Sequence, residues 1–369
     1  MSDFHGIIFA YSASPELREL VSRRTAASLP FCGRYRLIDF ALSSLMNAGV
    51  RDVGVIMQRD YQSLLDHLGG GKAWDMSRKN GGLRILPPFG LPVYHKGDYA
   101  GTIEALNAVS TYIRDIPQKN IIMMQGNVCA NIDLKAAMEQ HLKSDAPITA
   151  VCVDTHPDCD HFSYILGEDG YAHDMVYGRG NETGVAGIEA YIVEKNLLLE
   201  MMDHCYKANL YRFHQDAMTR YLREGGKMAI YRHRGYTAAV RTADSYYKAS
   251  MDMLKTDVRR DLFPAERPVR TRNLEGVSTY YGEKAVSRNS LVADNCIIEG
   301  EIDNCIVFPG VRIAEGAVIR NCVIMNGCVI EKGAQLECVI ADKHCTVGEN
   351  VALRGNEKLP VVMPKRSKI

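Results

Sequence analysis

The chain has 369 residues, 46% of them apolar and 24% charged, a composition that excludes collagen-like, coiled-coil and disordered proteins. Lysine plus arginine and aspartate plus glutamate both number 44, so no net charge attracts nucleic acid or an acidic membrane. No apolar run approaches the roughly 18 residues of a membrane helix, and the N-terminus lacks the basic start of a signal peptide. Eleven cysteines without a CxxC pair favour a reducing, cytoplasmic compartment.

Residues 1–245 predict a first domain in which short apolar strands alternate with helices. Strands are expected at 6–10, 53–58, 121–124 and 148–153, and helices at 37–48, 61–68, 103–113 and 134–141. This alternation indicates an α/β domain with a parallel sheet that is covered by helices on both faces. Because such sheets bind ligands at the carboxyl ends of their strands, the expected site comprises loops 11–17, 58–71 and 125–131.

Residues 246–285 predict a linker, and residues 286–369 predict a repetitive domain. The linker combines a helix over about 242–255 with an irregular stretch that contains arginine and proline. In the last domain apolar residues recur every six positions, in columns such as Val318, Ile324, Ile330 and Leu336. Small or turn-forming residues punctuate the steps at Gly310, Gly316, Asn321, Gly327 and Gly333. A period of six predicts a hexapeptide β-helix of three or four coils.

Six of the eleven cysteines fall in the repetitive segment, namely Cys296, Cys305, Cys322, Cys328, Cys338 and Cys345. A metal ladder would be the functional interpretation of such a column. No histidine pattern accompanies these cysteines, so we expect them to fill tight coils as small apolar residues.

Several long motifs, in the right order, resemble glucose-1-phosphate adenylyltransferase, also called ADP-glucose pyrophosphorylase. They are PFCGRYRLID at 30–39, HLGGGKAWDMSR at 67–78, Gly-Thr at 101–102, SMDML at 250–254 and FPGVRIAEGA at 308–317. The chain is identified as a member of this family from residue 6 to about 352. The resemblance implies a Rossmann-like nucleotidyltransferase domain joined to a left-handed parallel β-helix.

The first departure from the family lies in the loop after the first strand. The family has A-G-G-x-G-[ST]-R-L, in which glycines let the backbone approach the triphosphate and the arginine neutralises charge. Here residues 10–17 read AYSASPEL. The glycine positions carry Tyr11, Ser12 and Ser14, and the arginine position carries Glu16, which would repel a polyphosphate.

The phosphate-binding lysine and both metal ligands of the family are also replaced. The lysine of R-A-K-P is Ala26 here, although Arg23 or Arg24 could compensate. The aspartate of G-D-H has become Asn127, and that of W-K-D-V-G-T has become Ala239. Mg²⁺ prefers carboxylate ligands, and nucleotidyl transfer depends on positioning and charge, so these losses together predict little catalysis.

The resemblance therefore implies a non-catalytic, regulatory-type second subunit, such as some bacteria have beside a catalytic one. The complex makes ADP-glucose and pyrophosphate from ATP and glucose 1-phosphate in glycogen biosynthesis. We expect a mixed tetramer with a catalytic paralogue, Mg²⁺ in that partner, and no cofactor on this chain.

Three alternatives stay open at the level of sequence. An active adenylyltransferase with a rebuilt site would take its metal ligands from Asn127, Asp133, Asp154 and Asp174. A stand-alone sensor of a sugar phosphate or nucleotide would keep a ligand pocket and need no partner. An acyltransferase, the least favoured, would use His344 in the β-helix.

A vestigial ligand site is predicted in the family's nucleotide-side segment. Its candidate residues are Gly69, Gly71, Trp74, Asp75 and Arg84. They could contact a nucleotide or a neighbouring subunit. For Trp74, packing in the core is the competing interpretation, since a lone tryptophan is more often packed than exposed to a ligand.

Overall fold

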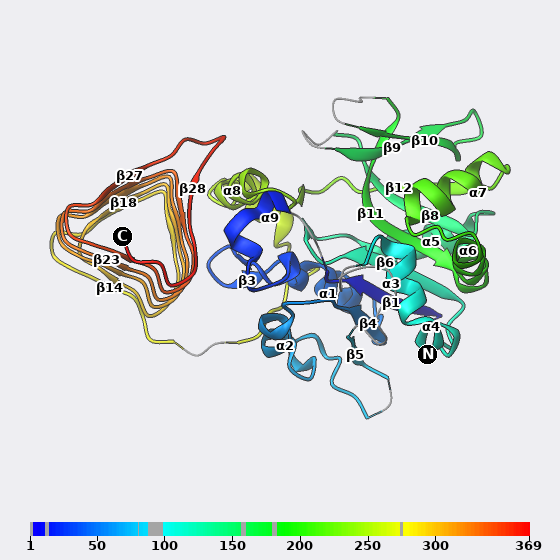
Figure 1. Cartoon of the computed structure of the whole chain (residues 1–369), viewed down its shortest axis with the longest axis horizontal. Coiled ribbons are helices and arrows are strands. Elements are labelled where there is room, and N and C mark those ends of the chain that lie inside the picture. Colours follow the sequence, from blue (N-terminus) through cyan, green and yellow to red (C-terminus); the bar gives the residue numbers. More distant parts are fainter. Residues whose placement is uncertain are drawn as a thin grey trace.

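The computed structural model describes residues 3–11, 15–79, 81–87, 99–155, 160–178, 183–273 and 276–369. An α/β domain and a triangular β-helix form the molecule, with α8 (Ala243–Asp252) and α9 (Thr256–Leu262) between them (Figure 1). The predicted fold class is thereby confirmed. Within the described ranges, no helix is long and apolar enough to cross a lipid bilayer.

Nine strands form the central sheet of the α/β domain: β1 (Phe4–Phe9), β4 (Val53–Ile56), β5 (Leu83–Leu86), β6 (Asn120–Gln125), β8 (Ile148–Val153), β9 (His161–Leu166), β10 (Ala172–Gly178), β11 (Val185–Glu194) and β12 (Met228–Arg232). Their order is β5-β4-β1-β6-β11-β8-β12-β10-β9. β1 pairs in parallel with β4 and β6, whereas β11 runs antiparallel to β6 and β8. The four strands that the sequence predicted, β1, β4, β6 and β8, therefore run in the same direction, but the expectation of a parallel sheet was wrong for the sheet as a whole, which is mixed. β9, β10 and β11 are joined by short connections, and strands joined in this way run antiparallel because the chain reverses its direction between them.

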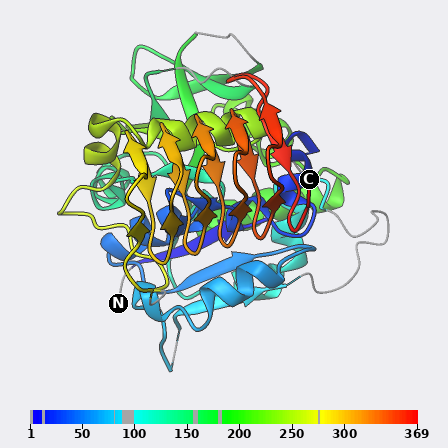
Figure 2. The same cartoon turned by 90° about the vertical axis from the view of Figure 1, so that its left-hand side faces the viewer.

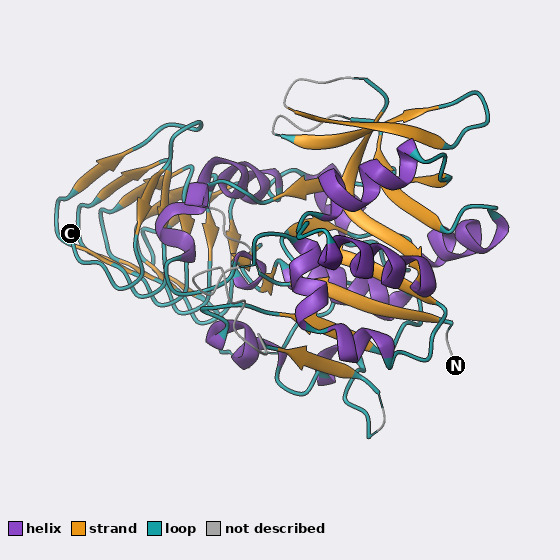
Figure 3. Ribbon diagram, turned by 45° about the vertical axis from the view of Figure 1, so that its right-hand side comes forward, coloured by secondary structure: helices purple, strands orange, loops and turns teal. Residues whose placement is uncertain are grey.

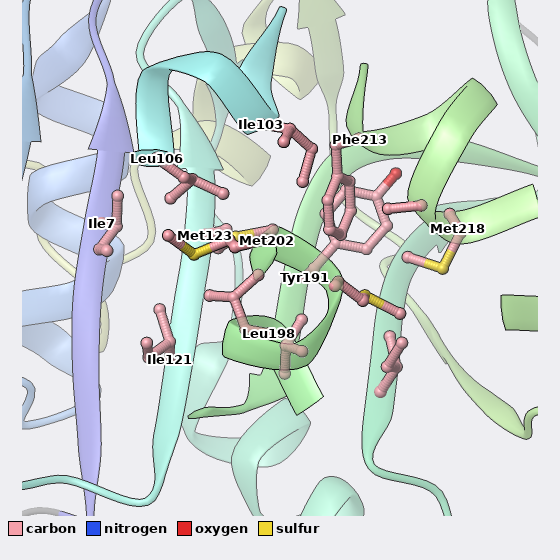
Figure 4. Close-up of a cluster of buried hydrophobic side chains, with 14 of the residues drawn as sticks. Ile7, Ile103, Leu106, Ile121, Met123, Tyr191, Leu198, Met202, Phe213 and Met218 are labelled. Carbon is pink, nitrogen blue, oxygen red and sulfur yellow. The ribbon is translucent and has the colours of Figure 1, made fainter. Parts of the chain in front are cut away.

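Helices cover both faces of this sheet, as predicted (Figure 3). They are α1 (Ile38–Asn47), α2 (Gln62–Leu68), α3 (Thr102–Ala108), α4 (Ser110–Arg114), α5 (Leu134–Lys143), α6 (Lys195–Lys207) and α7 (Thr219–Arg223). On one face, Leu106 of α3 and Leu198 of α6 are buried in a cluster with Ile7 of β1 (Figure 4). On the other face, Leu42 of α1 packs in a cluster with Ile8. Successive residues of β1 thus serve opposite cores, as strand geometry requires.

The C-terminal domain is a left-handed parallel β-helix with a five-stranded sheet on each side of a triangle, whose outline is seen in Figure 1. Figure 2 shows its coils side by side. The first sheet has β14 (Tyr280–Tyr281), β17 (Ile297–Ile298), β20 (Arg312–Ile313), β23 (Val329–Ile330) and β26 (Thr346–Val347). The second has β15 (Val286–Arg288), β18 (Glu301–Asp303), β21 (Val318–Arg320), β24 (Gln335–Glu337) and β27 (Ala352–Arg354). The third has β16 (Leu291–Val292), β19 (Ile306–Val307), β22 (Val323–Ile324), β25 (Val339–Ala341) and β28 (Val361–Met363).

The β-helix is longer than the repeat predicted. Each sheet has five strands, so the expectation of three or four coils was wrong. The first strand, β14, lies inside the range expected to be a connector, where the six-residue repeat is weak. The last coil closes with β28, which follows a break in the repeat at 355–360. The boundaries at residues 245 and 285 remain predictions.

The punctuating residues of the repeat form the corners of the triangle. Positive φ angles occur at all five of them, namely Gly310, Gly316, Asn321, Gly327 and Gly333. Glycine and asparagine are the residues that adopt this left-handed conformation most readily. The cysteines of the repeat are buried, and thiols such as that of Cys328 donate to backbone carbonyls, here that of Asp342 at 3.0 Å. They fill the coils, as predicted.

The two domains share a hydrophobic cluster. Phe308 and Met325 of the β-helix are buried with Leu29 and with Tyr246 of α8. The short elements on the α/β side are β2 (Pro30–Phe31), β3 (Tyr35–Arg36), β7 (Val128–Ala130) and β13 (Thr237–Ala239). The Tyr246 hydroxyl donates to the carbonyl of Pro30 at 2.6 Å. This joint fixes the position of the β-helix relative to the loops that the sequence marked as the site.

Candidate functional site

The two positions that replace metal ligands lie next to each other. β13 pairs antiparallel with β7, with Ala239 opposite Val128, so that Asn127 borders Val240. The Asn127 side-chain amide donates to the Val240 carbonyl at 2.9 Å, and the Asn127 carbonyl accepts from the Val240 amide at 3.0 Å. Residues separated by more than a hundred positions thus form one site. The side-chain amide of Asn127 is already bonded to the backbone, and the side chain of Ala239 is a methyl group.

The residues around this point do not fit a magnesium ion. Mg²⁺ is held by carboxylates, and in the described ranges no three His, Cys, Asp or Glu residues gather as a metal-binding group. Asp133 caps α5 through the Ala136 amide at 3.0 Å. Asp154 forms an ion pair with Arg232, and Asp174 accepts from the Met175 amide at 2.8 Å on β10. The carboxylates that a rebuilt site would need therefore serve other contacts.

Tyr11 fills the space at the carboxyl end of β1. Its ring packs edge-on against Phe9, with centroids 6.0 Å apart, and against Tyr99, at 5.2 Å. Burial raises the pKa of the Tyr11 hydroxyl well above its usual value. Ser12 and Ser14 lie outside the described residues. The aromatic ring of Tyr11 takes up space through which, in the family, glycines let a triphosphate approach the backbone.

The other two replaced positions lie away from that ring. Glu16 is exposed on the short 3-10 helix Pro15–Val21. Ala26 is completely buried in the cluster shared by the two domains, so its side chain does not reach a cleft. Arg24 does not compensate, because its guanidinium forms a buried ion pair with Asp342 of the β-helix.

A cavity of about 520 Å³ lies beside β13, and we refer to it as the degenerate cleft. Its lining includes Ala239, Arg241, Asp154 and His161. Arg241 forms an ion pair with Glu189 of β11, a contact that the sequence did not suggest. The available signal was local: Arg241 stands where the family's W-K-D-V-G-T stretch has its glycine.

Two further cavities share the lining residues Arg34, Tyr35, His67 and Arg272, and the smaller one is also lined by β-helix residues such as Phe308 and Lys343. Their volumes are about 1160 and 450 Å³, and together they form what we call the basic cleft. Its cationic side chains are Arg34, Arg36, Lys72, Arg259, Arg270, Arg272 and Lys343. Burial, together with repulsion from Arg36 and Arg24, lowers the pKa of Lys343 to about 7.

The structure separates the predicted vestigial ligand residues. Gly69 lines the basic cleft. Gly71, with φ +74°, lies where an added Cβ would come within 2.8 Å of the Leu83 side chain, so its contact is with the core. Trp74 is completely buried, and its indole NH donates to the Arg270 carbonyl at 3.1 Å. The packing interpretation of Trp74 is the one that this geometry favours.

The remaining two residues of that set are on the surface. Asp75 is exposed and forms an ion pair with Arg78 at 3.2 Å. Arg84 is exposed on β5, at the edge of the sheet. Among the described residues that line the basic cleft with Gly69, neither Asp75 nor Arg84 occurs. Their role in ligand binding stays a prediction.

Comparisons with known proteins agree with this architecture. Residues 6–172 match the family model described as nucleotidyl transferase, and residues 276–358 match GlmU-like, C-terminal hexapeptide. "Glycogen biosynthesis protein GlgD" of Bacillus subtilis (strain 168) is 31% identical over 98% of this chain and 95% of its own length. The protein of that name from Geobacillus stearothermophilus is 32% identical over 85% and 82%. "Glucose-1-phosphate adenylyltransferase" of Thermomicrobium roseum is 33% identical over 96% and 84%.

Fold and motifs together define a nucleotidyltransferase-type domain that carries a hexapeptide β-helix. The chain belongs to the glucose-1-phosphate adenylyltransferase family, which confirms the family predicted from its motifs.

Proposed function

We propose that this chain is a non-catalytic, regulatory subunit of glucose-1-phosphate adenylyltransferase in glycogen biosynthesis. The observation that carries the proposal is the pair Asn127 and Ala239, which lie together where the family's motifs have two aspartates. An amide bonded to backbone and a methyl group supply no charge for Mg²⁺. The relatives named for glycogen biosynthesis support the pathway.

The chain acts, on this proposal, through a catalytic paralogue in a mixed tetramer. The two domains that match family models support this role, because a scaffold that no longer catalyses is still able to present surfaces to a partner. One candidate surface is the open first coil of the β-helix, where β14 is an edge strand. Tyr280 and Tyr281 on it are 58% and 46% exposed. Exposed aromatic residues on an unpaired edge are typical of contacts with another chain.

The basic cleft is where we propose that the regulatory signal is read. Within the described ranges, none of Arg34, Arg36, Arg259, Arg272 and Lys343 forms an ion pair with a carboxylate. Arg34 and Arg272 are exposed, and Arg36, Arg259 and Lys343 are half-buried. Such a cluster of cations favours binding of a small anion, above all one carrying phosphate. Because residues of both domains line the smaller cavity of this cleft, an anion bound there would contact both domains.

The experiment mixes the purified chain with its catalytic paralogue. Alone, with Mg²⁺, ATP and glucose 1-phosphate, the chain should show negligible turnover against the usual range of roughly 1–10³ s⁻¹. In the mixture it should change the kcat, the KM or the anion response of the catalytic chain, and co-elute with it on size exclusion. A variant with Tyr280→Asp and Tyr281→Asp tests the first-coil surface, with Tyr206→Asp on α6, 73% exposed, as the control.

A stand-alone sensor is the second candidate, favoured by the basic cleft alone. It predicts that the chain binds phosphate as a homo-oligomer and leaves the catalytic paralogue unchanged. Ordinary turnover by the isolated chain would contradict both candidates. Absence of mixed species at micromolar concentration would contradict the regulatory subunit and leave the sensor.

A further inference from the structure

The degenerate cleft contains a charge pair made by the chain itself. Arg241 follows β13, and its guanidinium forms an ion pair with Glu189 of β11. The same guanidinium donates to the carbonyl of Asp160, just before β9. The Arg241 and Glu189 side chains are 28% and 18% exposed, so the pair is largely withdrawn from solvent. One side chain thus joins three segments that the sequence separates widely.

Glu189 holds an unfavourable backbone conformation at this contact. Its φ is +56°, in the left-handed region that costs a residue with a Cβ about 1 kcal/mol or more. The conformation coincides with a shift in the register of β11 against β8 between Gly187 and Ala190. Such a conformation persists only where its surroundings hold it in place. The ion pair to Arg241 is the contact that holds the Glu189 side chain.

The pair also lies among the residues that replaced the family's site. The Glu189 charge acts on the hydroxyl of Tyr11, raising its pKa after the larger effect of burial. Both charges act on His214, whose pKa falls to about 4 mainly through burial. Its imidazole bonds the Tyr191 hydroxyl at 2.7 Å. The charge of Glu189 thus acts on both Tyr11 and His214.

We propose that the Arg241–Glu189 pair is an internal plug that closes the degenerate cleft to anionic ligands. Arg241 supplies a fixed positive charge beside Ala239, and Glu189 satisfies that charge in place of a phosphate. A phosphate that entered would have to displace the carboxylate and would be repelled by it. The bond to Asp160 keeps the start of β9 against the end of β13. The same contact thus occupies the positive charge of Arg241 that a phosphate in the cleft would need.

This inference rests on the proposed function, since it concerns the cleft that we propose has lost catalysis. The two are tested separately, because the plug is measured on the isolated chain and the partnership on the mixture. If the plug fails, the result with the catalytic paralogue is unaffected. If the partnership fails, the exchange measurements below still decide the plug.

Hydrogen exchange of the full chain, with and without inorganic phosphate, tests the plug. In the wild type, phosphate should leave exchange in 160–166 and 237–241 unchanged. In Glu189→Gly, which frees Arg241 and relieves the backbone, phosphate should slow exchange there about tenfold. Glu189→Gln should behave in the same way if the carboxylate charge is what excludes the anion. Adding Arg241→Gly to either variant should abolish the response.

The matched control is Arg232→Gln, which breaks the exposed pair with Asp154 at the rim of the same cleft. It should not create a phosphate response. Arg241→Gly alone should speed exchange at the start of β9 about tenfold, because the bond to Asp160 is lost. Equal phosphate protection in the wild type and Glu189→Gly, or none in either glutamate variant, would overturn the proposal.

Discussion

The degenerate cleft and the basic cleft of this chain differ in the balance of positive and negative side chains that line them. The lining of the degenerate cleft carries as many carboxylates (Asp154, Asp244 and Asp252) as lysine and arginine side chains (Arg234, Arg241 and Lys248), and Arg241 is paired with Glu189. The lining of the basic cleft carries seven lysine and arginine side chains against the two carboxylates of Asp66 and Asp294. In the basic cleft, Arg34, Arg36, Arg272 and Lys343 line a cavity without ion pairs in the described parts of the chain. Cations that are balanced by carboxylates of the chain need no bound ligand. Clustered cations without such partners are stabilised when an anion binds among them.

This difference indicates where a ligand still matters. On the proposed function, the degenerate cleft takes no substrate, and its balanced charges need no ligand. The surplus of cations in the basic cleft is instead stabilised when an anion binds. The following changes break or sharpen this comparison, starting with the largest effect.

Rebuilding the metal ligands should give the largest change. Asn127→Asp with Ala239→Asp adds two carboxylates at neighbouring positions of the β7–β13 pair, where Ala239 lies opposite Val128 and Asn127 bonds to Val240. Mn²⁺, used as a spectroscopic probe for Mg²⁺, should then bind at least about 100-fold more tightly. Turnover should stay negligible, because Tyr11 and Glu16 still oppose a triphosphate and each lost charge contact costs about 10²–10³ in rate. Adding Tyr11→Gly, Ser12→Gly, Ser14→Gly, Glu16→Arg and Arg241→Gly should raise turnover by orders of magnitude.

The control for that series adds the same two residue types elsewhere. Ala208→Asp with Asn209→Asp places two carboxylates at the exposed end of α6 and should not create the metal site. Ala26→Lys is left out, because that side chain is completely buried and a lysine there would be forced into the core. Full activity from the aspartate pair alone would show that the lost site has been located wrongly.

Breaking the buried ion pair between Arg24 and Asp342 should lower the free energy of unfolding by several kcal/mol. Asp342→Ala leaves the Arg24 guanidinium buried without a partner, which costs about 3–5 kcal/mol in the free energy of unfolding. Urea unfolding measures this cost. Glu301→Ala, which removes the exposed pair with Arg288 at 2.9 Å, should cost less than about 1 kcal/mol. Equal losses in the two variants would mean that the buried pair does not hold the domains together.

Removing cations from the basic cleft should reduce the affinity for an anion more than it reduces the free energy of unfolding. Sulfate or inorganic phosphate should raise the Tm of the wild type by a few degrees at millimolar concentration. Arg34→Gln with Arg272→Gln should remove most of that rise, because both residues line both cavities of the basic cleft. Arg288→Gln, on the exposed side of the β-helix, should leave it intact. A full response in the double variant would place the anion elsewhere.

The sequence predicted the architecture well and the contacts between segments poorly. The six-residue period identified the β-helix and its corner residues, because each coil repeats the same local requirement for a turn. It missed the first and last coils, since neither Tyr280–Tyr281 nor Val361–Met363 continues the repeat cleanly. The mixed direction of the sheet was missed because alternation of strands and helices does not encode the short connections around β10.

The candidate site shows the same division. Comparison of motifs identified Asn127 and Ala239, which the fold then places together. The pairing of Arg24 with Asp342 joins residues 318 positions apart, and one sequence holds no trace of it. The partner of Arg241 was equally hidden, because Glu189 reaches it from a strand whose register shifts at that point. Charge partners depend on tertiary packing, and that information is absent from local patterns.

The smallest effect concerns the protonation of Lys343. Its pKa is about 7 in the folded chain, because burial and the neighbouring arginines disfavour the ammonium, against 10.5 when unfolded. Between these values the unfolded state binds more protons, so the stability of the wild type rises as pH increases from 7 to 10.5. Below pH 7 the buried charge is present and its cost is complete. Lys343→Met should therefore stabilise the protein at pH 6 by about 2 kcal/mol, with a gain that shrinks towards pH 10.

Urea unfolding at pH 6, 7, 8.5 and 10 measures this trend, and Lys332→Met on an exposed part of the same domain should give a difference that does not change with pH. Because a bound anion would offset the cost of the ammonium, saturating phosphate should reduce the gain at pH 6, which ties Lys343 to the basic cleft. A difference that stays constant from pH 6 to pH 10 would contradict the assignment of a depressed lysine pKa to this cleft.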